Sequence, residues 1–109
     1  MLYIFEMANN HQGSVEHAKL IVDKFAELAN KYNISAGVKL QFRQLDTFIH
    51  KDYLDSDLKY VKRFKDTRLS KEQFTEITEY IREKNLVTMA TPFDNESIPW
   101  LKDLDISVV

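Results

Sequence analysis

The chain has 109 residues, 44% of them hydrophobic and 12% aromatic, which suffices for one compact unit and is too little for two. Its 15 lysines and arginines nearly balance its 17 aspartates and glutamates, which excludes a general attraction to nucleic acid or to an anionic membrane. The sequence contains no cysteine, signal-peptide pattern or long apolar span, so disulfides and thiolate metal sites are excluded and we expect a cytoplasmic protein.

The first third of the sequence predicts a strand, a loop and a helix. An apolar run of strand formers from Leu2 to Ala8, interrupted by Glu6, predicts a buried strand. Turn residues follow from Asn9 to Gly13, and Ser14 is placed to cap a helix that ends near Tyr32. The helix is expected to bury the apolar residues that recur at helical spacing, which are Ala18, Ile21, Val22, Phe25, Leu28, Ala29 and Tyr32.

A second strand is expected from Ala36 to Phe42, followed by an irregular stretch. The side chains of this strand alternate, so that one face carries Val38, Leu40 and Phe42 and the other carries Lys39, Gln41 and Arg43. The stretch 44–67 mixes aspartates with aromatic residues, and we interpret it as a long loop with one helical turn.

The clearest helix boundary in the sequence lies at Ser70. Ser70 and Gln73 have the spacing of a capping box, and Leu69 and Phe74 have the spacing of a hydrophobic staple. These two patterns predict a helix from Lys71 to about residue 84.

The last part of the sequence predicts two further strands with a short helix between them. A third strand is expected from Leu86 to Thr91, and Pro92 and Phe93 are expected to form a turn. Asp94 is placed to cap a short helix, and a fourth strand is expected to open at Ile106–Val109. The apolar residues of the short helix are Ile98, Leu101 and Leu104.

The alternation of nearly apolar strands with helices predicts an α/β fold with parallel strands. Four strands in a chain of this length is the repeat density of a (β/α)₈ barrel, which needs about 250 residues to close. A small open α/β sheet has the same local pattern, so periodicity leaves both architectures open.

Polar side chains near the ends of the predicted strands are candidates for a site, because ligands of parallel α/β folds bind at the carboxyl ends of strands. Lys39 is suited to hold a carboxylate or phosphate, Gln41 to bond sugar hydroxyls, and Glu6 to transfer protons or position water. The alternative is an ion pair between Glu6 and Lys39 with a purely architectural role, since a charge in a buried strand needs a partner.

Two loops leave similar alternatives open. Asn10 and His11 are either part of a turn that leads into the cap at Ser14 or part of a binding loop, and a single histidine without a partner at ligand spacing argues against a metal site. Thr91, followed by Pro92 and Phe93, either ends a strand before a helix cap or adds to a site where helix amides bind an anion.

Three segments in order, FEMANNHQGS at residues 5–14, GVKLQF at 37–42 and ATPFD at 90–94, resemble the N-terminal half of the N-acetylneuraminate (sialic acid) synthase family. The resemblance implies the N-terminal half of a (β/α)₈ TIM barrel with about four parallel strands. It also implies a transferase that condenses phosphoenolpyruvate with an open-chain N-acetylated amino sugar of the N-acetylmannosamine kind, releases phosphate by C–O cleavage and needs a divalent metal, Mn²⁺ or Mg²⁺. A homo-oligomer, a dimer, is expected.

The resemblance also assigns roles by position. Lys39 and Thr91 look like contacts to phosphoenolpyruvate, Gln41 looks like a contact to a sugar hydroxyl, and Glu6 looks like the carboxylate near the reacting carbons. Lys39 and Glu6 are thus the catalytic candidates. By the same resemblance, Asn10 and His11 look like substrate-binding residues of the active-site loop.

Two departures from the family pattern leave the acceptor sugar open. Met7 and Ala8 replace the usual Ile and Gly, and Ala90 replaces a Ser, so relatives that make legionaminic or pseudaminic acid and spore-coat polysaccharide proteins are similar as well. In the family a phosphate-binding Lys follows the segment that matches Ser107–Val109, and the metal-binding histidines lie on later strands. We therefore expect a partial barrel domain that lacks the second half of the barrel and the C-terminal antifreeze-like domain.

That expectation keeps two other functions open. The fragment is expected to be inactive alone, as a non-catalytic half-barrel that binds ligand or associates with itself. The other alternative is a different phosphoenolpyruvate-condensing synthase, one that makes a seven- or eight-carbon sugar acid.

Overall fold

The computed structural model describes residues 1–42 and 68–106 of the chain. These residues form one parallel sheet of three strands in the order β1-β2-β3, with helices following each strand. The elements are β1 (Leu2–Ala8), α1 (Val15–Tyr32), β2 (Ser35–Phe42), α4 (Lys71–Glu83), β3 (Val87–Pro92), the 3₁₀ helix η2 (Asn95–Ser97) and α5 (Ile98–Asp103).

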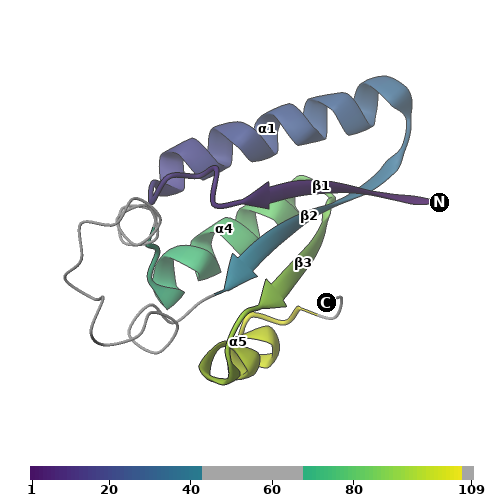
Figure 1. Ribbon diagram of the computed structural model, residues 1–109. Coiled ribbons are helices and arrows are strands. Elements are labelled where there is room, and N and C mark those ends of the chain that lie inside the picture. The colour runs from purple at the N-terminus through teal and green to yellow at the C-terminus, as the bar shows by residue number, and fades with distance from the viewer. Residues whose placement is uncertain (43–67, 107–109) are drawn as a thin grey trace.

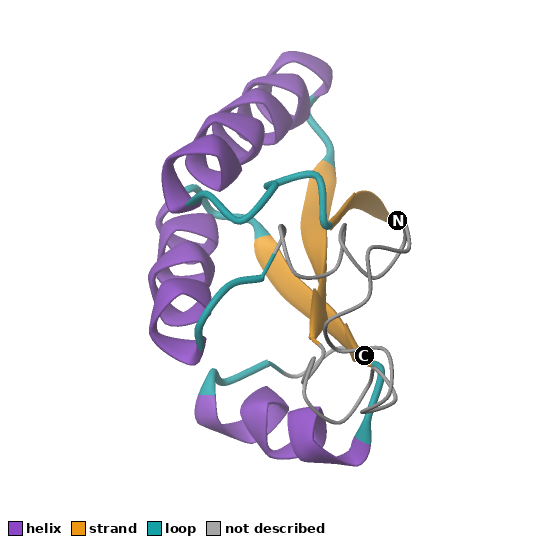
Figure 2. Cartoon of the chain, turned by 60° about the vertical axis from the view of Figure 1, so that its left-hand side comes forward, coloured by secondary structure: helices purple, strands orange, loops and turns teal. Residues whose placement is uncertain are grey.

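The sheet has one face that helices cover and one that no described helix covers. Helices α1 and α4 lie side by side on the same side of the strands, and α5 lies beyond the end of β3 (Figures 1 and 2). The loop expected over 44–67 lies outside the described residues. So does the strand expected at Ile106–Val109 apart from Ile106, which is not in a strand.

Local sequence signals account for both long helices. The Ser14 hydroxyl accepts a hydrogen bond from the His17 amide (3.1 Å) and begins α1, as predicted. At α4 both bonds of the capping box are present: the Gln73 amide donates to Ser70 Oγ (3.1 Å), and the Ser70 amide donates to Gln73 Oε1 (2.8 Å). Three strand boundaries shift by one residue: β2 begins at Ser35, and β3 begins at Val87 and extends to Pro92, which was predicted to lie in the turn.

The core lies between the covered face of the sheet and the two long helices. Val38, Leu40 and Phe42 on β2 have no exposed surface, which confirms the predicted alternation along this strand. Ile77 and Ile81 of α4 are equally buried. Each such side chain contributes about 1.5–3 kcal/mol by leaving water, so this face supplies most of the stabilisation of the described fold.

The prediction that β1 is a buried strand is wrong for most of its length. Leu2, Tyr3 and Ile4 are 41, 47 and 56% exposed, because β1 lies at the edge of the described sheet, with β2 as its one strand neighbour there. The apolar stripe of α1 is likewise only partly core. Leu28 and Tyr32 are 42 and 62% exposed, since they lie on a flank of the helix that no described element covers.

Candidate functional site

The register of the three strands brings the predicted site residues into two adjacent rows. Glu6 lies opposite Lys39, which lies opposite Met89, and Gln41 lies opposite Thr91 one step closer to the carboxyl ends of the strands. Neighbouring strands are about 4.8 Å apart, so side chains within a row can contact one another. These side chains lie on the face of the sheet opposite the helices, because β2 alternates and its even-numbered side chains are in the core.

Glu6 and Lys39 form an ion pair, with 3.2 Å between Glu6 Oε2 and Lys39 Nζ. The architectural pairing that the sequence left open is therefore present. The buried setting expected for these charges is not, because the side chains of Lys39 and Glu6 are 35 and 45% exposed on the uncovered face. A pair with this exposure contributes about 0–1 kcal/mol, so an incoming anion can take the place of Glu6 at Lys39 at little cost.

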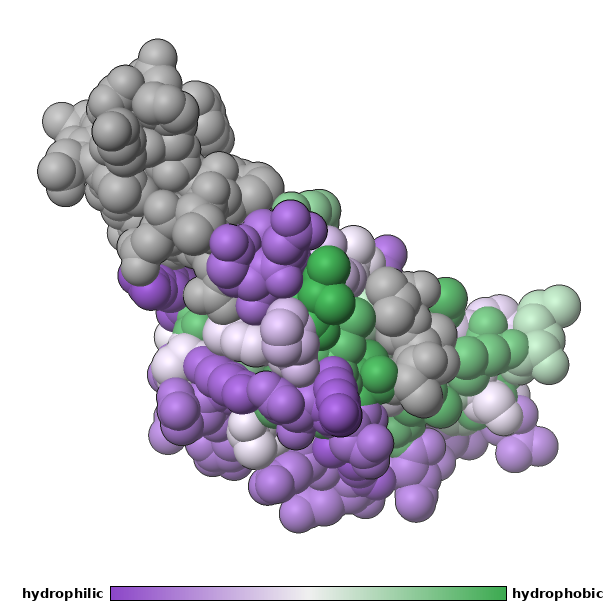
Figure 3. Space-filling model, turned by 90° about the horizontal axis from the view of Figure 1, so that it is seen from below, coloured by the Kyte–Doolittle hydropathy of each residue, from purple (hydrophilic) through white to green (hydrophobic). Residues whose placement is uncertain are grey.

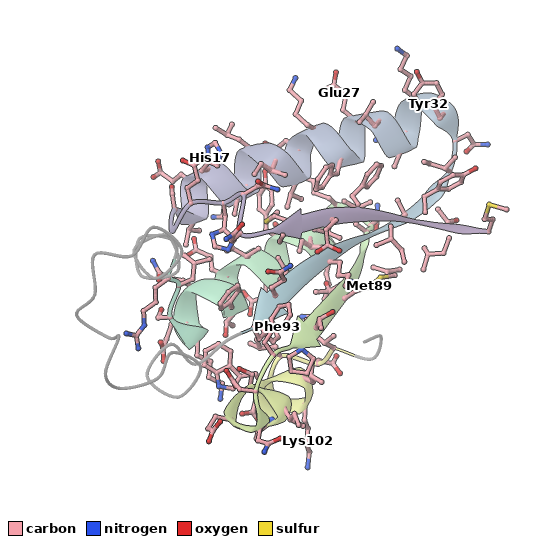
Figure 4. All side chains as sticks on the ribbon, viewed as in Figure 1. His17, Glu27, Tyr32, Met89, Phe93 and Lys102 are labelled. Carbon is pink, nitrogen blue, oxygen red and sulfur yellow. The ribbon has the colours of Figure 1, made fainter. Side chains whose placement is uncertain are left out.

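Gln41 and Thr91 lie half-buried beside each other at the carboxyl ends of β2 and β3. The pairing of the two strands continues past Thr91: the Phe93 amide donates to the Phe42 carbonyl (2.9 Å), and Phe93 itself is 45% exposed at the end of the strand (Figure 4). Asp94 Oδ1 accepts a hydrogen bond from the Ser97 amide (2.9 Å), so the predicted cap at Asp94 is confirmed. This capped turn fixes the backbone just beyond Thr91.

Gly37 and Met89 form an apolar floor on the same face: Met89 lies beside Lys39, and Gly37 lies two residues toward the amino-terminal end of β2. Met89 is only 2% exposed, and its Cε would lie 2.8 Å from a Cβ added at Gly37. Only a glycine lets the two strands and this side chain approach so closely. The sequence reasoning missed this floor, although the alternation of β3 places Met89 on the same face as Thr91.

Asn10 and His11 occupy the same loop but very different environments. Asn10 is exposed beyond the carboxyl end of β1, whereas His11 is 2% exposed. The Gly13 amide donates to His11 Nδ1 (3.1 Å), and the edge of the His11 ring meets Phe74 of α4 with 6.0 Å between centroids. Of the two side chains, that of Asn10 is the one accessible to solvent.

Within the described ranges, no group of three or more His, Cys, Asp or Glu side chains is arranged to hold a metal ion. The residues of the two rows do not fit a metal site either, since their one carboxylate is paired with Lys39. No described helix is both long and apolar enough to cross a membrane.

A second polar cluster joins α1 to α4 on their outer surface. Lys19 Nζ lies 2.8 Å from Glu76 Oε1, and the Tyr80 hydroxyl donates to Asp23 Oδ1 (2.6 Å). The hydrogen bond to Glu76 raises the pKa of Lys19, and the hydrogen bond to Asp23 raises the pKa of Tyr80. Lys84 Nζ lies 3.7 Å from the same Asp23 Oδ1. The cluster fastens the two helices and lies apart from the candidate site, on the other side of the sheet.

Comparison with known proteins identifies the family. The model of the NeuB family matches residues 25–109, a range that includes Lys39, Gln41 and Thr91. The chain belongs to the NeuB family. No curated protein sequence matches it significantly.

Two of the solved structures that match resemble this chain over almost its whole length. One is a protein from Chromobacterium violaceum assigned to spore coat polysaccharide biosynthesis (protein E), with 41% identity, a TM-score of 0.90 and coverage of 97% of this chain and 32% of that one. The other is the N-acetylneuraminic acid (sialic acid) synthetase of Leptospira borgpetersenii in complex with citrate, with 23% identity, a TM-score of 0.76 and coverage of 96 and 33%.

The likeness confirms the α/β fold class and the N-terminal part of a (β/α)₈ barrel as the architecture. The chain spans about a third of the length of the structures it matches. The uncovered face of the sheet corresponds to the interior of such a barrel, so the rows that contain Lys39 and Gln41 point toward the barrel axis.

Proposed function

We propose that the polar side chains of the two rows, Glu6, Lys39, Gln41 and Thr91, form the phosphoenolpyruvate-binding half of the site of a sialic-acid-synthase-type enzyme. The reaction condenses phosphoenolpyruvate with an N-acetylated amino sugar of the N-acetylmannosamine kind, gives a nine-carbon sugar acid and releases phosphate. The observation that carries the proposal is the pair of polar rows at the carboxyl ends of the strands, in a chain of the NeuB family.

Each side chain of the rows suits one part of this reaction. The Lys39 ammonium neutralises the carboxylate or phosphate of phosphoenolpyruvate, and the Thr91 hydroxyl donates a hydrogen bond to the same anion. The Gln41 amide bonds hydroxyl groups of the sugar. Once the anion has replaced it at Lys39, Glu6 becomes available to position water or move a proton near the reacting carbons.

The divalent metal, Mn²⁺ or Mg²⁺, belongs to the proposal and not to the described site. We expect its ligands on later strands of the barrel that these 109 residues do not include, and the roles proposed for Lys39, Gln41 and Thr91 do not depend on it. When bound, the metal would polarise an oxygen of the acceptor.

The proposal is tested by phosphate release from phosphoenolpyruvate, measured with the protein at the full length of its solved relatives and with N-acetylmannosamine as acceptor. Lys39→Met removes a charge-assisted contact and is expected to lower kcat/KM roughly ten- to a hundredfold. Lys84→Met, on the outer cluster, is the matched control and should leave the rate unchanged. Absence of phosphate release with every N-acetylated hexosamine would refute the proposal.

Two alternative functions can be tested separately. Leu2, Ile4 and Val87 are 41, 56 and 39% exposed, which favours self-association of a half-barrel that binds ligand without turnover. Sedimentation of the 109-residue chain as a stable monomer would count against it.

Phosphate release with aldose phosphates in place of N-acetylated sugars would instead indicate a synthase for seven- or eight-carbon sugar acids.

A further inference from the structure

The loop between β1 and α1 takes a conformation that its own residues do not favour. Ala8, Gln12 and Gly13 have φ values of 49, 55 and 74°, and the first two are not glycines. A non-glycine residue in this region costs of order 1–3 kcal/mol and persists only where its surroundings hold it. Something outside the loop must therefore fix its shape.

Backbone hydrogen bonds within the loop supply only part of that constraint. The Asn10 amide donates to the Met7 carbonyl, the Gln12 amide to the Asn9 carbonyl and the Ser14 amide to the His11 carbonyl, each at 3.0 Å. These are three consecutive turns, and each spans only four residues. None of them connects the loop to the rest of the fold.

His11 makes that connection. Its ring is 2% exposed and meets Phe74, which contacts Phe42 (4.9 Å between centroids) and Trp100 (6.0 Å). One end of this aromatic chain is thus the loop after β1, and the rest belongs to α4, the end of β2 and α5. At the loop end, His11 Nδ1 accepts the amide hydrogen of Gly13, the residue with the largest positive φ.

A nitrogen that accepts a hydrogen bond cannot carry a proton, so the neutral ring holds its proton on Nε2. We infer that His11 is a positioning residue: anchored on Phe74 and accepting from Gly13 through Nδ1, it holds the β1–α1 loop so that Asn10 is presented at the carboxyl end of β1. Its effect on a ligand passes through Asn10, and this part of the inference rests on the proposed function of the site.

Two substitutions separate this role from direct ligand contact. His11→Asn can keep an acceptor oxygen at the place of Nδ1, whereas His11→Gln moves the amide to the place of Nε2. Both lose the ring and its contact with Phe74, so they are matched for the packing loss, and the difference between them reports which position matters.

The first measurement needs no variant and no ligand. Nitrogen-15 NMR of the imidazole in the full chain is expected to show a proton on Nε2 and none on Nδ1, and a proton on Nδ1 would overturn the inference. Hydrogen exchange of the Gly13 amide should then be about fivefold faster in His11→Gln than in His11→Asn, which corresponds to the loss of one neutral hydrogen bond. Equal exchange in the two variants would likewise contradict it.

The second measurement tests the effect on the site, by titrating phosphoenolpyruvate into the same proteins while following the Asn10 amide. His11→Asn is expected to bind within about twofold of the unsubstituted chain and His11→Gln about fivefold more weakly. The reverse order would mean that Nε2 contacts the ligand and would overturn the positioning role. If the unsubstituted chain does not bind phosphoenolpyruvate, the proposed function fails, while the tautomer and the Gly13 exchange still decide whether His11 anchors the loop.

Discussion

The two faces of the sheet are built from the same strands but hold different kinds of side chain. Helices α1 and α4 cover one face, and no described helix covers the other (Figure 1). The covered face carries Val38, Leu40 and Phe42, none with any exposed surface. The opposite face carries Lys39 and Gln41, which alternate with these residues along β2 and are partly exposed. Its apolar side chains include Met89 beside Lys39 and Ile4 toward the amino-terminal end of β1. Seen from below, apolar surface extends toward the N-terminal end of the chain beside polar surface (Figure 3). Strand alternation thus places the core on one face and the polar side chains of the candidate site on the other.

The outer surface of α1 provides a third environment for comparison. His17, Glu27 and Tyr32 lie along the side of the helix away from the sheet (Figure 4). Among the described residues of this surface, polar contacts reach α4 through Lys19 and Asp23, which bond residues 57 positions away. These contacts hold the two helices together and take no part in the candidate site.

The largest effect is expected from truncating the covered face. Ile77→Ala removes a fully buried side chain, and the lost transfer energy and the cavity together lower the free energy of unfolding by about 2–5 kcal/mol. The matched change on the other face is Ile4→Ala, at a residue that is 56% exposed, with an expected cost below about 1 kcal/mol. Urea unfolding measures both, and equal losses would show that the two faces are packed alike.

A smaller loss is expected at the floor of the site. Gly37→Ala places a Cβ 2.8 Å from Met89 Cε and 3.0 Å from the Val87 carbonyl oxygen, which should lower the free energy of unfolding by about 1–3 kcal/mol. Met89→Ala removes the first contact but not the second. Gly37→Ala should therefore cost less in the Met89→Ala background than in the unsubstituted chain. A fully tolerated Gly37→Ala would mean that the floor is loosely packed.

The covered face also contains a defect that can be repaired. Thr88 is 5% exposed, and its hydroxyl finds no hydrogen-bond partner among the described residues. Thr88→Val keeps the shape and removes the unpaired hydroxyl, so the free energy of unfolding should rise by about 1 kcal/mol. Thr78→Val is the control, because the Thr78 hydroxyl donates to the Thr75 carbonyl (2.9 Å) and its removal should not stabilise the chain. A loss of stability in Thr88→Val would argue that the hydroxyl is bonded in solution.

The smallest effect concerns the outer cluster at alkaline pH. Hydrogen bonds to Glu76 and Asp23 raise the pKa of Lys19 above 10.5 and that of Tyr80 above 10.0. Folding therefore favours the protonated forms, so this stabilisation is fully present below about pH 10 and is lost as the pH rises through the folded values. Urea midpoints measured across that range should fall, and Tyr80→Phe should make the fall shallower. An identical slope in Tyr80→Phe would show that Tyr80 does not contribute to the fall in stability.

Sequence reasoning predicted the helix starts most reliably, because a cap depends on residues three positions apart. Ser14, Ser70 and Asp94 each begin a helix at the predicted place. The two faces of β2 were predicted equally well, since alternation is a local property of an extended chain. Where a prediction depended on what packs against an element, as for β1 and Leu28, it was wrong, because exposure is set by neighbours that are distant in sequence.

By itself, the sequence determined the order of strands and helices, the parallel α/β class and the side chains that share a face with Lys39, all of which follow from spacing along one segment. Tertiary structure alone decided that Glu6 reaches Lys39 and that His11 packs on Phe74, since both contacts join segments brought together by folding. It also decided that Met89 closes over Gly37. Local spacing fixes which way a side chain points, whereas strand register and helix packing fix what it meets.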